Sequence, residues 1–261
     1  MKIGDGWKRE IVAYRIFKDH FDYIPQTVPV RLPLGNDPSL QPELGSCQRY
    51  VADAETYISY SERRKVNPLV HLPPLQIQQT ALVDILLGSQ DREHSNILIK
   101  DDRLVLIDNG DSLGESLLRH DTPPSSFFNS ALGFHAGVAE ESLVTFIDQM
   151  DIESLIHQIQ TDSLISNKQA YELRFRYCLI QYLIHTFPTI PISEIAAAFA
   201  EKQRGKPALL AESIANKAWK IVNSESTAAM GEEELLGRFL SISRDLIQKT
   251  ILVKGEPRLD I

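Results

Sequence analysis

The sequence predicts an α+β protein that is mainly helical, with a short β-hairpin in its middle and a helical C-terminal half. Apolar residues recur at helical spacing over residues 75–87, and Gly88 stands where a helix often ends on glycine. Two apolar runs, residues 97–99 and 104–107, are separated by only four polar residues, which favours a hairpin. From about residue 140 onward, the apolar residues have the period of helices.

The N-terminal part is expected to hold one helix and two short strands. Residues 8–21 carry a broad apolar face, and Pro25 forbids continuation of that helix. Prolines and glycines make the chain irregular over residues 25–46, and residues 53–74 are polar and bounded by prolines. The expected strands lie at residues 28–32 and 47–51.

The C-terminal half supplies apolar bulk and contains no motif with an evident chemical role. A long loop is expected over residues 110–137, where Pro123 and Pro124 interrupt the pattern. The whole chain, residues 1–261, is interpreted as one domain. The expected helices are 139–149, 151–160, 167–186, 193–203, 207–223 and 231–252.

Composition limits the classes of protein to consider. The net charge of −8 argues against general nucleic-acid binding. Cys47 and Cys178 are too few for a disulfide framework, which favours a reducing compartment. The N-terminus has no apolar signal region, and no apolar run approaches the about 18 residues of a membrane span. We therefore expect a cytoplasmic protein without a transmembrane segment. The sequence does not predict an oligomeric state.

Three polar residues flank the predicted hairpin in an order that suits phosphoryl transfer. Asp91 and Asn96 lie five positions apart in the polar loop before the hairpin, and Asp108 follows it. Phosphoryl transfer needs a carboxylate near the attacking hydroxyl and oxygen ligands for Mg²⁺. Protein kinases place an Asp, an Asn and a second Asp in this same order. Each residue taken alone fits an ordinary polar loop or turn, so the hypothesis depends on all three together.

These residues resemble motifs of the phosphatidylinositol 3-/4-kinase-like superfamily. The likeness is greatest to the type II phosphatidylinositol 4-kinases and their bacterial relatives, and more distant to the HipA-like kinases. Asp91-Arg92 with Asn96 is similar to the catalytic loop of that family, and Ile107-Asp108-Asn109-Gly110 is similar to its metal-binding motif.

Two upstream segments extend the resemblance to about residues 8–115. Residues 45–51, Gly-Ser-Cys-Gln-Arg-Tyr-Val, look like the hinge that lies beside adenine. Residues 9–14 followed by 24–27 look like the helix-C region and its continuation. The family resemblance implies a kinase C-lobe with a helix-C and hinge region at 8–52, a catalytic core at 53–138 and a helical subdomain at 139–261.

The resemblance also implies cofactors and residue roles. ATP and Mg²⁺ would be the cofactors, Asp91 the catalytic carboxylate, and Asn96 and Asp108 the metal ligands. Glu10 would be the helix-C acid that pairs with a phosphate-binding lysine, and Arg92 would brace the loop. The residues implied to contact the nucleotide are Gln48, Arg49, Tyr50 and Val51.

Several alternatives remain open from the sequence. Only seven residues precede the helix-C-like segment, so we expect most of the N-lobe, with its phosphate loop and lysine, to be missing. A pseudokinase or binding module that keeps the C-lobe scaffold is therefore the second hypothesis. A Mg²⁺-dependent phosphatase or nuclease is a third. The substrate would be a protein hydroxyl or an inositol lipid. Two basic clusters, residues 63–65 and 202–220, have no strong amphipathic membrane pattern, which favours a protein or small-molecule substrate.

Overall fold

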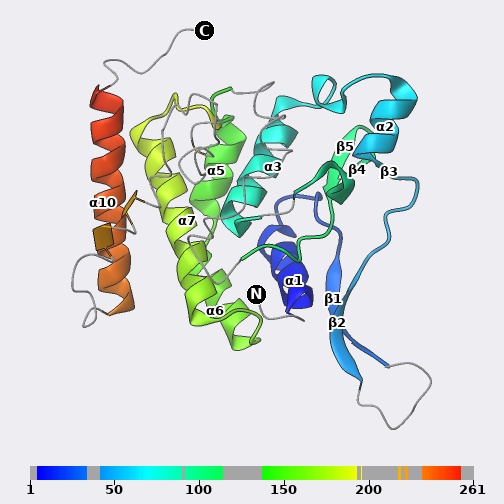
Figure 1. Cartoon of the computed structure of the whole chain (residues 1–261), viewed down its shortest axis with the longest axis horizontal. Helices are drawn as coiled ribbons and strands as arrows, with labels where there is room; N and C mark the ends of the chain where they lie inside the picture. The colour runs from blue at the N-terminus through cyan, green and yellow to red at the C-terminus, as the bar shows by residue number, and fades with distance from the viewer. Residues whose placement is uncertain are drawn as a thin grey trace.

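The structure is a computed structural model, and it is mainly helical with small antiparallel sheets, as predicted (Figure 1). It describes residues 5–33, 42–89, 92–113, 137–192 and 231–253, together with residues 195, 217–218 and 221–222. The strands are β1 (Thr27–Leu32), β2 (Glu43–Gln48), β3 (Glu55–Thr56), β4 (Ile97–Lys100) and β5 (Arg103–Leu106). The helices are α1 (Gly6–Phe17), α2 (Tyr57–Arg64), α3 (Pro74–Leu87), α5 (Glu141–Gln149), α6 (Ile152–Thr161), α7 (Asn167–Thr186) and α10 (Glu232–Val253), with short 3-10 helices η1 (Pro68–Val70) and η2 (His94–Asn96).

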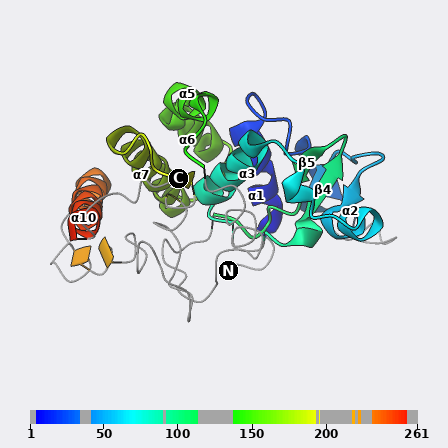
Figure 2. The same ribbon diagram turned by 90° about the horizontal axis from the view of Figure 1, so that it is seen from above.

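The helices form the body of the molecule, and the strands lie at one side of it. In Figure 1, α3, α5, α7 and α10 stand side by side, and the β1–β2 ribbon extends away from the body. Seen from above, α10 lies at one edge, and α2 with the β4–β5 hairpin lies at the opposite edge (Figure 2). Helix α7 contacts α3, α5, α6 and α10, so it holds the helical half together.

The first helix ends earlier than the sequence suggested. Helix α1 ends at Phe17, where residue 21 was expected, and a turn follows. Phe21 then packs against Phe17, with ring centroids 5.8 Å apart, and against Phe146 at 4.5 Å. The apolar character of Phe21 therefore reflects burial of its ring beside the helix rather than a further helical turn.

Two further boundaries differ from the prediction. The second strand, expected at 47–51, occupies Glu43–Gln48 because it pairs along its whole length with β1, from Thr27 opposite Gln48 to Leu32 opposite Glu43. Helix α2 was not predicted. It begins after Thr56, whose hydroxyl accepts a hydrogen bond from the amide of Ser59 at 3.1 Å, a typical N-cap.

The predicted central hairpin is confirmed. Strand β4 pairs with β5 from Ile97 opposite Leu106 to Lys100 opposite Arg103. Asp101 and Asp102 form the two-residue turn with φ angles of 50° and 56°, the left-handed conformation that matches the twist of a tight hairpin. The open end of the hairpin, opposite this turn, therefore carries the residues just before Ile97 and just after Leu106.

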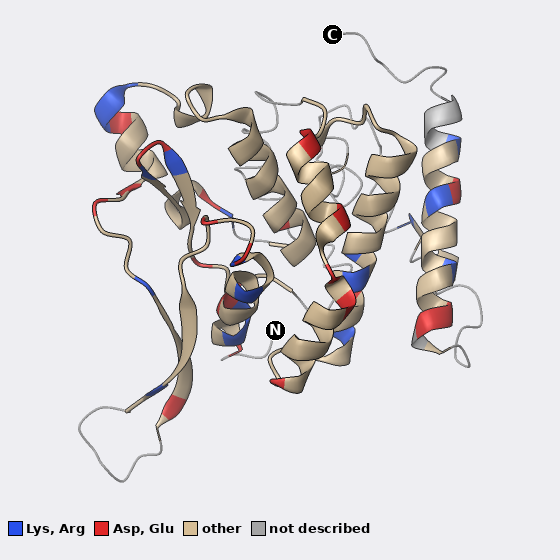
Figure 3. Cartoon of the chain, turned by 180° about the vertical axis from the view of Figure 1, so that it is seen from behind, with Lys and Arg blue, Asp and Glu red and all other residues tan. Residues whose placement is uncertain are grey.

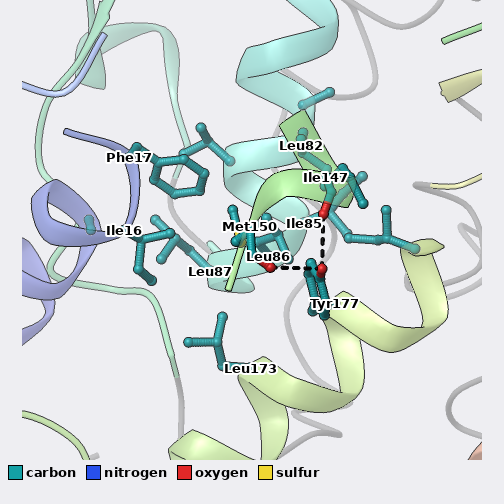
Figure 4. Packing of buried hydrophobic residues seen from close by; sticks show 14 of the residues in the cluster. Ile16, Phe17, Leu82, Ile85, Leu86, Leu87, Ile147, Met150, Leu173 and Tyr177 are labelled. Atoms are coloured by element: carbon teal, nitrogen blue, oxygen red, sulfur yellow. Dashed lines mark hydrogen bonds between the residues drawn. The ribbon is translucent and has the colours of Figure 1, made fainter. Parts of the chain in front are cut away.

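The core lies between α1, α3, α5 and α7. Helix α3 is buried on nearly all sides, which agrees with its apolar sequence. Figure 4 shows Ile16 and Phe17 of α1 facing Leu86 and Leu87 of α3, with Leu173 of α7 nearby. A polar contact lies within this apolar cluster. The Tyr177 hydroxyl is 2.9 Å from the carbonyl of Ile147 and 3.0 Å from that of Met150.

The predicted helices of the C-terminal half are confirmed where the structure describes them. Helix α7 matches the predicted range, and Ser166 with Gln169 forms a capping box at its start. Helices α5, α6 and α10 differ from prediction by one or two residues at their ends. The helices expected at 193–203 and 207–223 lie largely outside the described residues, as does most of the loop at 110–137. None of the described helices combines the length and the apolar character that a membrane crossing needs.

Candidate active site

Arg92 is the structural centre of the candidate site. Its side chain is only 1% exposed, yet all three of its nitrogens have hydrogen-bond acceptors. Nη1 donates to the carbonyls of Ile107 at 2.7 Å and Asn96 at 3.1 Å, and Nη2 donates to Oδ1 of Asn109 at 2.5 Å. Arg92 therefore connects the loop before the hairpin to the residue just before β4 and to the residue just after β5.

Asp84 completes the environment of Arg92 from the last turn of α3. Arg92 Nε donates to its carboxylate, at 3.1 Å from Oδ1 and 3.3 Å from Oδ2. Burial raises the pKa of the Asp84 carboxyl, and the Arg92 guanidinium opposes this rise. Sequence reasoning missed Asp84, although a single acid within the apolar run 81–87 was a signal that it has a buried partner.

Asn109 connects Arg92 to Glu10 of α1. Its side-chain oxygen accepts from Arg92, and its Nδ2 donates to Glu10 Oε2 at 3.2 Å. Burial raises the pKa of Glu10, the negative charge of Asp108 adds to the rise, and hydrogen bonds from Asn109 and Gly110 oppose it. The predicted helix-C acid thus contacts the predicted Asp-Asn-Gly motif directly.

A second contact joins α1 to the same motif. Nη1 of Arg9 donates to the carbonyl of Gly110 at 3.0 Å, and the same nitrogen lies 3.9 Å from a carboxylate oxygen of Asp111. Arg9 is almost wholly buried, unlike a solvated helix residue. The sequence analysis did not single out Arg9, because one arginine near a helix N-terminus carries no distinctive pattern.

The hairpin brings Asn96 and Asp108 to the same end of the sheet. Ile107 donates its backbone N–H to the carbonyl of Asn96 at 3.1 Å, which extends the ladder by one bond beyond the strands. Asp108 follows at once, exposed to solvent, with a φ of 53°. Asparagine and aspartate tolerate this left-handed conformation better than most residues. The predicted proximity of the two residues follows from this register.

Three oxygen-bearing side chains, those of Glu10, Asn96 and Asp108, belong to the residues near this end of the hairpin. A carboxylate oxygen of Asp108 and one of Glu10 lie 3.6 Å and 3.7 Å from the point where a Cβ on Gly110 would stand. Among the described residues, no group of three or more His, Cys, Asp or Glu side chains could hold a metal ion. Mg²⁺ is usually bound by only one or two carboxylates, with water and phosphate oxygens as the other ligands. Asp108 and Asn96 are therefore the kind of donor that Mg²⁺ takes, and Glu10 lies near Asp108.

The predicted hinge residues lie at the other end of the hairpin. Gln48 ends β2 and donates from Nε2 to the Thr27 hydroxyl at 3.3 Å, and Arg49 donates its amide to Gln26 at 2.7 Å. Tyr50 and Val51 follow, and their backbone groups form no hydrogen bond to another described residue. These amides and carbonyls could therefore form the backbone hydrogen bonds that an adenine ring makes with a hinge segment.

The predicted catalytic residue, Asp91, lies outside the described residues, directly before the buried Arg92. Of the residues predicted for the site, the structure brings together Glu10, Arg92, Asn96 and Asp108. It places the hinge-like residues 48–51 apart from them, beyond the turn end of the hairpin.

Comparisons with known proteins do not add to this picture. No family model matches the chain, and a search of curated proteins gives no match.

Proposed function

We propose that the protein is an ATP- and Mg²⁺-dependent phosphotransferase of the phosphatidylinositol 3-/4-kinase-like type. In this proposal the structure is a kinase C-lobe with little of the N-lobe. It acts in the cytoplasm on a protein hydroxyl or an inositol lipid. The observation that carries the proposal is the continuous contact from Glu10 through Asn109 to Arg92. That contact joins the helix-C-like, metal-binding and catalytic-loop segments, three motifs that are far apart in the sequence.

Each motif then has a defined chemical task. Asp91 would accept the proton of the attacking hydroxyl. Asn96 and Asp108 would hold Mg²⁺, which neutralises phosphate charge when bound. Arg92 contacts none of the reacting atoms in this scheme. It fixes the backbone at Asn96 and Ile107, and so sets the separation of the two metal ligands.

The hinge-like segment would provide adenine recognition. The uncommitted backbone groups of Tyr50 and Val51 suit the donor and acceptor edge of adenine. Leu98, half-buried on β4, lies between this segment and the open end of the hairpin. A nucleotide placed across Leu98 would direct its phosphates towards Asn96 and Asp108.

The second candidate is a pseudokinase or binding module, and one contact favours it. No lysine or arginine among the described residues forms an ion pair with Glu10, and Asn109 donates to Glu10 instead. In an active kinase the helix-C acid pairs with the phosphate-binding lysine. With Asn109 in this position, Glu10 has a hydrogen-bond partner within the chain itself, as an interaction scaffold requires.

Transfer of the labelled γ-phosphate of ATP distinguishes the two candidates. The chain would be incubated with Mg²⁺ and either phosphatidylinositol vesicles or a mixture of purified proteins. Asp91→Asn removes the proposed base, and Glu93→Gln removes an exposed acid two positions away as the control. Transfer that Asp91→Asn abolishes and Glu93→Gln retains supports the kinase. Transfer that survives Asp91→Asn contradicts the assigned role, and nucleotide binding without any transfer supports the pseudokinase.

A further inference from the structure

A cleft of about 540 Å³ lies at the turn end of the β4–β5 hairpin. Its walls come from the last turn of α1, the segment 21–26, the hinge-like residues 49–52 and the hairpin residues 100–105. The volume is within the range of roughly 300–1,000 Å³ typical of small-molecule sites. Asn96, Asp108 and Glu10 do not line this cleft, so it is separate from the candidate metal end.

Positive charge gathers in the cleft, although the chain is acidic. Four basic residues line it against two acidic ones, Asp22 and Asp101, while the whole chain has a net charge of −8. Elsewhere both signs are mixed, as along α10 (Figure 3). The basic residues of the cleft are Lys18, Arg49, Lys100 and Arg103.

Three of these cations have no carboxylate partner among the residues that the structure describes. Lys18 lies 3.6 Å from Asp19, but Arg49, Lys100 and Arg103 form no ion pair with any described residue. Lys100 and Arg103 also stand directly opposite each other across the hairpin. Like charges in opposite positions destabilise an antiparallel pair. Among the described residues, no carboxylate forms an ion pair with either side chain to relieve this repulsion. A bound anion would therefore offset it.

The walls of the cleft are held in place before any ligand binds. Tyr23 accepts a hydrogen bond from the amide of Leu106 at 2.7 Å, which ties the segment after α1 to β5. Gln26 accepts from the amide of Arg49 at 2.7 Å, which ties the same segment to the hinge-like residues. Three aromatic side chains, Tyr14, Phe21 and Tyr50, line the cleft, and Tyr50 is 85% exposed. A pre-formed cleft reduces the ordering cost of binding.

We propose that this cleft binds a small soluble molecule that carries a phosphate or polyphosphate group. Guanidinium and ammonium groups form short, charge-assisted hydrogen bonds to phosphate oxygens, and Tyr50 offers a face for an attached ring. The cleft is too small for a nucleic acid and has cations where a Mg²⁺ site has carboxylates. The proposal uses none of the candidate catalytic or metal-binding residues, but it shares Arg49, Tyr50 and Val51 with the segment proposed to recognise adenine.

Calorimetric titration of the full chain with sodium tripolyphosphate, in EDTA without divalent metal, tests the proposal. The expected result is saturable one-site binding. We expect K100Q/R103Q to weaken this binding at least tenfold. The control K168Q/K249Q removes two exposed lysines from α7 and α10 and should bind as the wild type does. Asp108→Asn should also bind normally, because the cleft is distinct from the metal end.

The same titrations define the contrary results. Absence of saturable binding, or unchanged binding by K100Q/R103Q, would overturn the proposal. If K168Q/K249Q weakens tripolyphosphate binding as much as K100Q/R103Q does, the binding is non-specific electrostatic attraction. If Asp108→Asn weakens it, the anion binds at the metal end. Circular dichroism and thermal melting of each variant establish that it is folded. If K100Q/R103Q is unfolded, the single variant Arg49→Gln replaces it, with the same expected direction and the same contrary result.

Discussion

Arg92 donates a hydrogen bond from Nη2 to Oδ1 of Asn109 over 2.5 Å, in a setting where both side chains are about 99% buried. Through this bond the loop before the hairpin supports the motif after it. Because Asn109 also donates to Glu10, a single buried network spans α3, the hairpin and α1.

Arg92→Lys is expected to destabilise the fold by about 2 kcal/mol or more. Lysine keeps the charge beside Asp84, but one ammonium cannot reproduce the contacts with Asn96, Ile107 and Asn109. The free energy of unfolding from urea titration measures the loss. The control is Arg174→Lys, because Arg174 pairs with Glu153 near the surface, where ion pairs contribute only about 0–1 kcal/mol. Equal losses in both variants would contradict a special role for Arg92.

Glu10→Gln is expected to stabilise the protein at neutral pH, with a gain that shrinks as the pH falls. The folded-state pKa of Glu10 is raised above its ordinary value by burial and by Asp108, so its ionised form is disfavoured in the fold. Wild-type stability is therefore fully present below the unfolded-state pKa and is lost as pH rises through the folded-state pKa. Glutamine cannot ionise and escapes this loss.

Urea unfolding of wild type and Glu10→Gln between pH 4 and pH 7 measures the effect. Glu62→Gln, at an exposed position of α2, controls for removal of one charge from an acidic chain. A Glu10→Gln variant that is less stable than the wild type at pH 7 would contradict this account. Such a result would mean that the ionised Glu10 carboxylate stabilises the network by more than the burial of its charge destabilises the fold.

Two helix C-caps should respond with opposite signs. Lys65, which ends α2, has a φ of 54°, so Lys65→Gly is expected to add about 0.5–1 kcal/mol of stability. Gly88, which ends α3, has a φ of 59°, and a Cβ there would approach Arg176 to 2.9 Å. Gly88→Ala is therefore expected to cost about 1 kcal/mol or more. Thermal melting measures both changes.

The control for the C-caps is Lys65→Ala, which removes the same side chain without relieving the left-handed backbone. We expect no gain from it. If Lys65→Ala stabilises as much as Lys65→Gly, the effect comes from charge rather than from conformation.

The sequence predicted the elements whose signals are local. The hairpin at 97–106 and helices α3 and α7 follow from apolar period, turn residues and caps, and the structure agrees with them. The helix α2 was missed because only Tyr57 and Tyr60 are buried on it, so its apolar pattern is short. Asp84 and Arg9 were missed for another reason. Their roles come from tertiary contacts with Arg92 and Gly110 that no spacing along the chain encodes.

The candidate site was predictable in part. The hairpin register brings Asn96 and Asp108 to one end, as the motif order implied, and Asn109 holds Glu10 beside the motif that contains Asp108. The separation of the hinge-like residues from these three was not predictable. It depends on tertiary contacts. Tyr23 accepts a hydrogen bond from Leu106 of the hairpin, and Gln26 accepts one from Arg49.

Calorimetric titration of ATP in the presence of Mg²⁺ tests the central claim most directly. Three proteins are compared, all in a K100Q/R103Q background that removes the proposed phosphate contacts of the cleft: the otherwise wild-type chain, Asp108→Asn, and Asp53→Asn as a matched control. Asp53 is likewise exposed and left-handed, with a φ of 58°, so asparagine makes the same change of charge in the same backbone conformation. The account predicts Mg²⁺-dependent binding that Asp108→Asn weakens at least tenfold and Asp53→Asn leaves unchanged. An affinity of the otherwise wild-type chain that is the same in Mg²⁺ and in EDTA, or is retained by Asp108→Asn, would contradict a metal-dependent nucleotide site at the end of this hairpin.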